Sequence, residues 1–402
     1  MFFVAAVPTR AQKENGINLS LWKGVSTQKD DTSGSTLLNI GLLSSMNRLE
    51  GVGLNILGGN VREDVRGAQI SGIFNTVRGH MLGMQVSGIT SVNAGGFTGI
   101  SISGLFGIHG KKSTGLSTAL LGNMVDEEYH GLLLGGLANV DTGNFKGIAL
   151  AGLGNLITGS QRGMNLSALL NVTGGSSSGI LIAGIGNINA KTYTGLNASL
   201  MGNVCGEGFT GLQLSVLANV TTGLSGMQIG AVNIASEGKG VQVGLYNYHH
   251  ENFDGLQLGL INANPSTRLE AMLSTGSMSM LSAGLRFKNS WNYTILSLGV
   301  NNYDLHGVDL SLGYRAGIWY AIKNNLSLSG DLGIMHDGNM TKKKGRTNRI
   351  YSLQARVNLE YQFSDPLSLF LSGGYQNSRD YHGHGFSKGL FLEAGTFISL
   401  GN

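Results

Sequence analysis

Few side chains in this sequence of 402 residues stand close enough together to do chemistry. The densest acidic stretch is Asp126 to Glu128, and three neighbouring acids form a solvated loop more often than a catalytic group. His249 to Glu251 and the pair His382 and His384 have the residue types of a metal site, but exposed loop histidines are the simpler interpretation. We therefore expect no enzymatic activity, no metal site and no cofactor.

Other motifs that carry chemistry are also missing. The serines do not stand in a nucleophile elbow, and the glycine-rich phrases lack the lysine of a phosphate-binding loop. A single cysteine, Cys205, excludes an internal disulfide framework and a cysteine-ligated zinc site. The formal net charge of +4 gives no reason to expect nucleic acid as a partner.

One basic cluster remains as a candidate contact for an anionic glycan or lipopolysaccharide, although a solvated loop tip is the simpler interpretation. It consists of Lys342, Lys343, Lys344, Arg346 and Arg349.

Glycine, with 65 residues against 3 prolines, follows a period of 16 over the first two thirds of the chain. The repeat glycines are Gly51, Gly67, Gly83, Gly99, Gly115, Gly131, Gly147, Gly163, Gly179, Gly195 and Gly211. Eight places after such a glycine there is usually an asparagine, as at Asn139, Asn155, Asn171, Asn187, Asn203 and Asn219. Fixed self-similarity of this kind is typical of repeat architectures.

Each repeat predicts one coil of a β-solenoid. Apolar residues fall one, three, six and nine places after the glycine, and two small residues at positions four and five interrupt the alternation. A corner between two short strands explains that interruption, and it also absorbs the one-residue deletion in the repeats from Gly226 onward. In stacked coils the asparagines are placed to form a ladder. We expect the solenoid to display an uncharged face that carries Gln, Ser and Asn side chains.

One large transmembrane β-barrel of about 22 strands is the alternative. The ten-residue segments that open the repeats contain no charged residue, and ten residues is the length of a transmembrane strand. Against this alternative, the connections stay near six residues, whereas membrane barrels alternate short turns with long loops.

After Pro265 the pattern changes to strict alternation, as in the segment from Tyr351 to Phe363. About eight such segments are joined by tight turns alternating with long polar loops, which predicts an antiparallel outer-membrane barrel with apolar residues toward lipid. Aromatic residues near strand ends, including Tyr293, Trp319 and Tyr320, suit interfacial girdles. A soluble barrel whose apolar face is its core is the alternative.

The predicted class is all-β, with three segments. Residues 1–15 resemble the end of a secretory signal peptide, residues 16–264 form the repeat region, and residues 265–402 form the barrel region.

Several phrases resemble the uncharacterised surface-repeat proteins of Bacteroidota. They are the opening from Ile17 to Gln28, the Gly-x-Gln-x-Ser/Gly repeats, the junction before Pro265, and the phrases from Ala355 to Tyr361 and from Ser372 to Tyr375. The resemblance implies an exported protein of the outer membrane or cell surface of a Gram-negative bacterium, and it brings no activity. We expect a non-enzymatic structural or binding protein, with outer-membrane lipid and a surface glycan or another envelope protein as partners. The rival function is a channel or transporter built from the single large barrel.

Overall fold

The computed structural model describes residues 14–22, 24–28, 34–301, 309–339, 349–380 and 385–400. The chain divides into two compact units, Met1–Thr222 and Gly223–Asn402. The described residues form strands, turns and loops, and they include no helix long and apolar enough to cross a membrane. The predicted signal segment lies outside the described residues except for its last two positions, Glu14 and Asn15, which begin the first strand.

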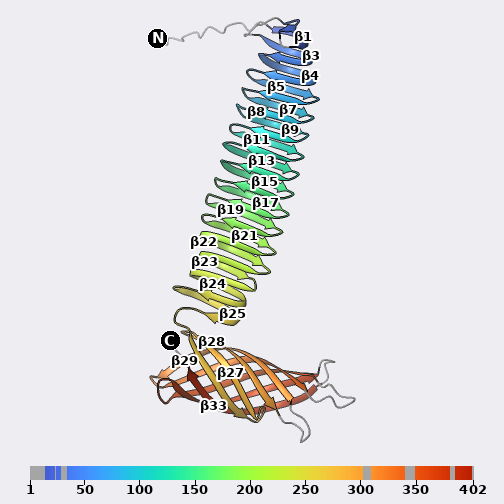
Figure 1. Cartoon of the computed structure of the whole chain (residues 1–402). Helices are drawn as coiled ribbons and strands as arrows, with labels where there is room; N and C mark the ends of the chain where they lie inside the picture. The colour runs from blue at the N-terminus through green and yellow to red at the C-terminus, as the bar shows by residue number, and fades with distance from the viewer. Residues whose placement is uncertain are drawn as a thin grey trace, which may run out of the picture. The chain divides into compact units, whose positions relative to one another are not determined.

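The first 25 strands form a β-solenoid of about 14 turns, as predicted (Figure 1). A regular coil has one longer and one shorter strand joined by a corner. The longer strands are β5 (Val65–Ser71), β7 (Met81–Ser87), β9 (Phe97–Ser103), β11 (Ser113–Ala119), β13 (Glu128–Gly135), β15 (Asn144–Ala151), β17 (Gln161–Ser167), β19 (Ser177–Ala183) and β21 (Tyr193–Ser199). The shorter strands are β6 (Phe74–Val77), β8 (Thr90–Asn93), β10 (Phe106–His109), β12 (Gly122–Val125), β14 (Ala138–Asp141), β16 (Gly154–Ile157), β18 (Leu170–Thr173) and β20 (Gly186–Asn189).

At both ends of the repeat region the strands are less regular. The first coils contain β1 (Glu14–Trp22), β2 (Val25–Ser26), β3 (Ser35–Met46) and β4 (Arg48–Val61), and the last contain β22 (Gly202–Ser215), β23 (Ala218–Ile229), β24 (Val232–His249) and β25 (Phe253–Ala263). In β3, β4 and β25 the corner within the coil is extended, and in β22 and β23 the connection between two coils is extended, so that two short strands merge into one.

The repeat glycines stack because the coils pair in parallel with a shift of 16 residues. Gly115 is in register with Gly99 on one side and Gly131 on the other. Its φ is +133°, and a Cβ there would lie 2.0 Å from the carbonyl oxygen of Gly99. Only glycine tolerates that backbone conformation and that close approach. The 16-residue period of the sequence is therefore the register of the sheet.

This parallel pairing rules out the single large barrel. Neighbouring coils pair in parallel over the whole length of β11, β13 and β15, whereas the strands of a transmembrane barrel run antiparallel. The alternative of about 22 strands is wrong because the connections of the repeats turn corners within a coil instead of forming hairpins.

The last eight strands close into an antiparallel barrel in which β26 pairs with β33. They are β26 (Arg268–Gly276), β27 (Leu281–Lys288), β28 (Asn292–Asn301), β29 (Asp309–Lys323), β30 (Leu326–Asn339), β31 (Ile350–Gln362), β32 (Leu367–Asp380) and β33 (Gly385–Ser399). The last strand of the solenoid ends at Ala263, next to the composition change that the sequence places at Pro265.

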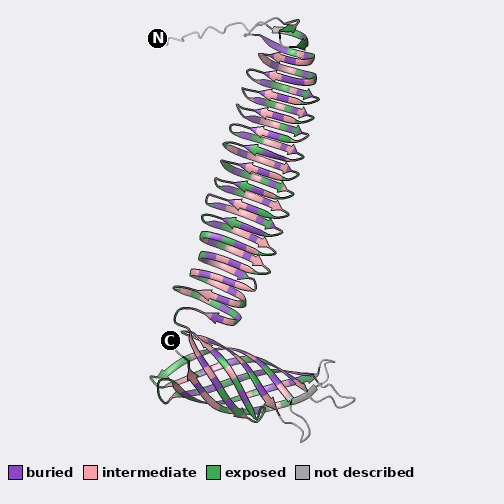
Figure 2. Ribbon diagram, viewed as in Figure 1, coloured by how far each residue is buried: buried purple, intermediate pink, exposed green. Residues whose placement is uncertain are grey.

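Burial alternates along the barrel strands (Figure 2). In β31 the buried side chains are polar, as for Gln354, Arg356 and Glu360, and the intervening exposed ones are apolar, as for Leu353 and Val357. The alternative of a soluble barrel with an apolar core is therefore wrong, because in this barrel the polar face points inward.

Candidate functional site

The interior of the coils contains an asparagine ladder. The Nδ2 of Asn155 donates to Oδ1 of Asn171 over 2.9 Å, and Asn171 donates in the same way to Asn187 over 3.0 Å. Each Nδ2 also reaches a backbone carbonyl, as between Asn155 and Leu166 at 3.0 Å. The ladder runs through Asn123, Asn139, Asn155, Asn171, Asn187, Asn203 and Asn219. The predicted ladder is confirmed.

A column of rings lies beside the ladder and includes one histidine. His109 stacks on Phe97 with ring centroids 5.0 Å apart, and Tyr129 lies on its other side at 6.1 Å. The Nδ2 of Asn93 lies 3.3 Å from Nδ1 of His109 and can only donate, so Nδ1 accepts, and Nε2 carries the proton and donates to Oγ of Ser117 over 2.8 Å. Burial lowers the pKa of His109 to about 4, because the interior does not solvate an imidazolium. The histidine is therefore a neutral structural group.

The outer surface of the coils is aliphatic, and here the sequence-based expectation was wrong. The Gln, Ser and Asn side chains of the repeats point inward; Gln85, Ser101 and Asn171, for example, are fully buried. The residues one and three places after the repeat glycine point outward, as do Ile100 and Ile102. The displayed face is uncharged, but it carries isoleucine and leucine in place of amides.

Apolar side chains also cover the corner of each coil. This apolar edge consists of the exposed residues Leu120, Leu137, Leu153, Leu169, Ile185, Leu200, Met201, Val216 and Leu217. The connection at the other end of the coil bears exposed ionisable residues and forms a charged edge. Its members include Arg62, Glu63, Arg66, Arg78, Lys111, Lys112, Asp126, Glu127, Lys146, Arg162, Lys191 and Glu207. Each coil of this unit is thus amphipathic from edge to edge.

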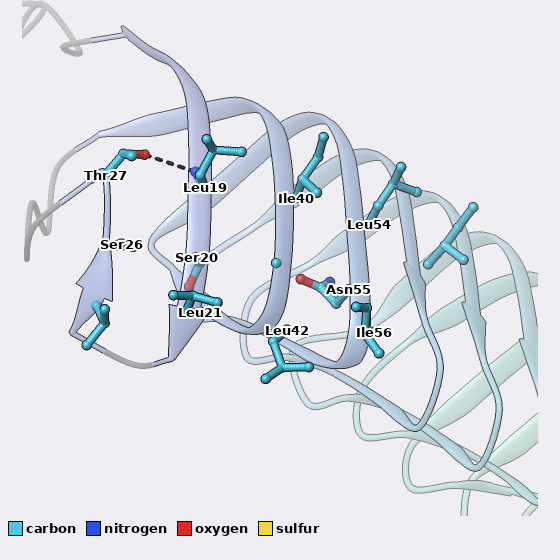
Figure 3. A pocket seen from close by; sticks show the side chains of 13 residues that line it. Leu19, Ser20, Leu21, Ser26, Thr27, Ile40, Leu42, Leu54, Asn55 and Ile56 are labelled. Carbon is cyan, nitrogen blue, oxygen red and sulfur yellow. Dashed lines mark hydrogen bonds between the residues drawn. The ribbon is translucent and has the colours of Figure 1, made fainter.

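An apolar groove runs along the corners of the first coils (Figure 3). One wall is a row formed by Leu19, Ile40 and Leu54, and the opposite wall includes Leu21, Leu42 and Ile56. The small or buried residues Ser20, Gly41 and Asn55 lie between the rows. The groove has a volume of about 730 Å³, and no charged residue lines it.

A second groove occupies the same coil positions further along the chain. It has a volume of about 790 Å³ and is lined by residues three to five places after the repeat glycine, among them Leu134, Leu150 and Ile182. Gly136 and Gly152 also line it, and a Cβ at either position would clash with a carbonyl oxygen of the preceding coil. Volumes of 300–1,000 Å³ with mainly apolar walls are typical of small-ligand sites. The repeat thus builds an apolar groove as a regular feature of its corner.

The lumen of the barrel holds a first cluster of ion pairs around Arg286. This side chain is buried, forms two hydrogen bonds to Glu360 at 2.7 and 2.9 Å, and also pairs with Glu270. Lys288 lies 3.2 Å from Glu360, and the Arg286 guanidinium stacks on the ring of Phe397. Two cations face two anions, so the cluster is neutral.

A second cluster fills the lumen beyond the first. Arg356 pairs with Asp331 at 2.9 Å and with Glu393 at 2.6 Å, and Arg315 lies 3.6 Å from Asp331. This cluster is also neutral. A void that it borders, lined by Arg315, Met335 and Glu393 among others, measures about 10 Å³, room for at most one water molecule. A pocket of about 350 Å³, lined by Lys288 and Glu360 among others, opens at the end of the barrel that holds the turn at Asn324, and the rest of the described lumen is filled by its own side chains.

The residues predicted for the basic cluster and for the aromatic girdles are not all where the sequence analysis expects them. Lys342, Lys343, Lys344 and Arg346 lie outside the described residues, and Arg349 is exposed just before β31. Tyr293 and Trp319 do not belong to an outer girdle: Tyr293 donates to Asp331 in the lumen over 2.7 Å, and Trp319 donates to the carbonyl of Asn289. Tyr320 is exposed, as a girdle requires. Among the described residues, no group of His, Cys, Asp and Glu side chains is placed to hold a metal ion.

No protein-family model and no curated protein matches the chain. Among the solved structures that match, two each cover 34% of the chain. One is a de novo designed transmembrane β-barrel, with 13% identity, a TM-score of 0.23 and 97% of that chain covered. The other is the outer membrane protein Ail of Yersinia pestis in a phospholipid bilayer nanodisc, with 14% identity, a TM-score of 0.24 and all of that chain covered.

Two features of the site were not predicted from the sequence. Arg286 and Glu360 are 74 residues apart on strands that are not neighbours, so no local pattern pairs them. The groove arises from position five after the glycine, which is small in most coils and leucine or isoleucine in others, as at Leu120 and Ile56. That irregularity is the signal that corners face outward, because a buried corner would not accept both sizes.

Proposed function

We propose that the chain is a non-enzymatic protein of the bacterial outer membrane, anchored by its eight-stranded barrel, whose solenoid is an uncharged binding surface. The observation that carries the proposal is the inverted burial of the barrel. Outward residues such as Leu298, Leu332 and Val357 are aliphatic and more than half exposed, whereas the inward side chains include two clusters of paired charges. In water this arrangement would leave a large apolar surface uncovered, and in a bilayer it is the expected one.

The backbone supports the same conclusion. Closure of β26 on β33 leaves no open edge in the barrel, so its N–H and C=O groups are paired within the sheet. A hydrocarbon environment requires this, since each unpaired group there costs several kcal/mol. Bacterial barrels of this type lie in the outer membrane.

The filled lumen favours an anchor over a channel. Arg286 of β27 reaches Glu360 of β31, and Arg315 of β29 lies 3.9 Å from Glu393 of β33, so both neutral clusters link strands on opposite sides of the barrel. Eight strands enclose an interior just wide enough for side chains. The barrel therefore has no continuous aqueous path through the described residues.

The aliphatic surface of the solenoid favours an apolar partner over a sugar. A glycan is bound by hydrogen-bonding groups, and the amides of the repeat are engaged in the interior, as in the Asn155 ladder. Rows such as Ile100 and Ile102 offer apolar contact area instead.

Planar-bilayer recordings of the full chain test the anchor. We expect insertion without stable conductance steps. Arg286→Ala combined with Glu360→Ala removes the cross-link nearest one mouth and is expected to raise the leak, whereas Lys323→Ala, an exposed residue at the end of β29, is the matched control. Large, stable pores in the unaltered protein would overturn the proposal.

A further inference from the structure

Apolar side chains cover three sides of the coils in the first unit. The face of the longer strands carries Ile148 and Leu150, the corner carries Leu153, and the face of the shorter strands carries Leu156. All four belong to one coil and are 37–49% exposed. A flat protein partner can cover one side of such a coil, whereas a fluid surrounds all three.

Charge is restricted to the fourth side. In the same coil Lys146 is exposed at the charged edge, and the ten residues that follow it contain no ionisable group. The pattern recurs along the stack: Arg162 precedes one uncharged segment and Lys191 another. An edge-to-edge division of this kind is the β counterpart of an amphipathic helix that lies in a membrane interface.

The backbone of the coils is hydrogen-bonded from coil to coil, as apolar surroundings require. Leu153 N–H donates to Leu137 O over 2.7 Å, so even the corner is hydrogen-bonded to the preceding coil. Within the stack each coil pairs with the next over its strands as well. The lateral surface therefore exposes aliphatic side chains over a paired backbone, the condition for contact with hydrocarbon.

The grooves have the form that a chain-like apolar ligand requires. In the first coils, two parallel rows of side chains, with Leu19 and Leu21 at one end, form the walls of the uncharged groove, which runs across successive coils (Figure 3). Since coils are about 4.8 Å apart, a groove that crosses four of them is about 15 Å long. An extended acyl chain is narrow, long and apolar, and it matches this shape.

We infer that the acyl chains of membrane lipids cover the apolar edge of the solenoid and fill its grooves, with the charged edge in the aqueous or headgroup layer. The inference rests on the proposed function, because the barrel brings the bilayer within reach of the chain. The solenoid is then a lipid-contacting module. A second copy of the chain is the competing occupant, and it would leave two of the three apolar sides in water.

Fluorescence quenching in lipid vesicles tests the inference with the full chain. Cys205, the single cysteine, is replaced by serine, and an environment-sensitive fluorophore is attached to one introduced cysteine at a time. Leu153→Cys reports the apolar edge, Lys146→Cys reports the charged edge of the same coil, and Leu332→Cys reports the outer wall of the barrel. The vesicles are phosphatidylcholine with or without nitroxide groups on the acyl chains.

We expect strong quenching at positions 153 and 332 and several-fold weaker quenching at 146. Quenching at 332 without quenching at 153 would overturn the inference and leave the anchor intact. Absence of quenching at 332 would overturn the anchor itself. Protection of 153 from aqueous iodide that depends on protein concentration, without acyl-chain quenching, would identify a second copy as the occupant and would also overturn the inference.

Discussion

Asn155 and Asn171, sixteen residues apart, lie in register in neighbouring coils and share a hydrogen bond of 2.9 Å between side-chain amides that are both buried. Because this ladder and the buried glutamines and serines occupy the interior, much of the aliphatic content of the repeat is left for the outside. The barrel has the same division, with Arg286 and Glu360 inside and leucines outside. Both regions therefore bury polar groups and expose apolar ones.

The ladder makes a prediction with an internal control. Asn171→Leu removes a donor and an acceptor and leaves the Nδ2 of Asn155 without its amide partner, so it is expected to lower the stability of the solenoid by about 1–3 kcal/mol. Asn165→Leu in the same coil is expected to raise the stability of the solenoid. Neither amide atom of Asn165 has a hydrogen-bond partner among the described residues, and Leu181 occupies the equivalent position in the next coil. Urea titrations should move in opposite directions; equal losses for both variants would contradict the ladder.

His109 predicts a pH dependence. Its pKa is about 4 in the folded protein and near 6.5 when unfolded, so between these values the unfolded state binds more protons. Stability is therefore expected to fall as the pH drops from about 6.5 to about 4, by about 3 kcal/mol in all, and this contribution levels off below pH 4. His109→Asn, which matches Asn93 in the preceding coil, should lose this dependence. Hydrogen exchange of the coils around β10 at several pH values measures it, and identical profiles for the two proteins would refute the assignment.

Asp141 predicts a dependence of stability on pH with the opposite sign. Burial raises its pKa to about 6, although the backbone N–H of Gly143 donates to the carboxylate over 2.9 Å. The folded state therefore binds more protons between about pH 4 and 6, and this group lowers stability as the pH rises through that window. Asp141→Asn keeps the acceptor for Gly143 and is expected to stabilise the coil at pH 7 by up to about 3 kcal/mol. In this variant, hydrogen exchange of β14 and the neighbouring coils at pH 7 should be slower than in the unaltered protein. Unchanged or faster exchange would contradict the predicted stabilisation.

The lumen predicts strong coupling between Arg286 and its two acids. Arg286→Met leaves Lys288 as the one cation of this cluster for the two buried carboxylates of Glu270 and Glu360, and it is expected to destabilise the barrel by about 3–5 kcal/mol. Glu270→Gln added to this variant should restore most of the loss, because Glu360 then remains paired with Lys288 and the cluster is neutral again. Urea unfolding in detergent micelles measures the effect, with exposed Lys323→Met as the control. A double variant, Arg286→Met with Glu270→Gln, that is no more stable than Arg286→Met would show that the charges are not coupled.

The periodic features were predictable, because the sequence repeats them. Gly115 and Asn155 recur at a fixed spacing, and that spacing is the register of the coils. The direction of the faces in the solenoid was not predictable, since the repeat separates polar from apolar positions without stating which set is inside. In the barrel the alternating turn and loop lengths supplied the missing information for strands such as β31. The pairing of Arg286 with Glu360 depends on which strands face each other across the lumen, and a one-dimensional pattern does not contain it.

The account depends most on lipid covering the apolar outside of the barrel, and collision of a spin label with two quenchers tests this directly. The label is attached at Val357→Cys on the outer wall of β31 and, as a control, at Asn324→Cys in the turn after β29, both in a Cys205→Ser background and in reconstituted bilayers. Oxygen concentrates in hydrocarbon, and a nickel chelate stays in water. We predict that the label at position 357 collides mainly with oxygen and the label at 324 mainly with the nickel chelate. Equal access of the nickel chelate to both positions would contradict the account.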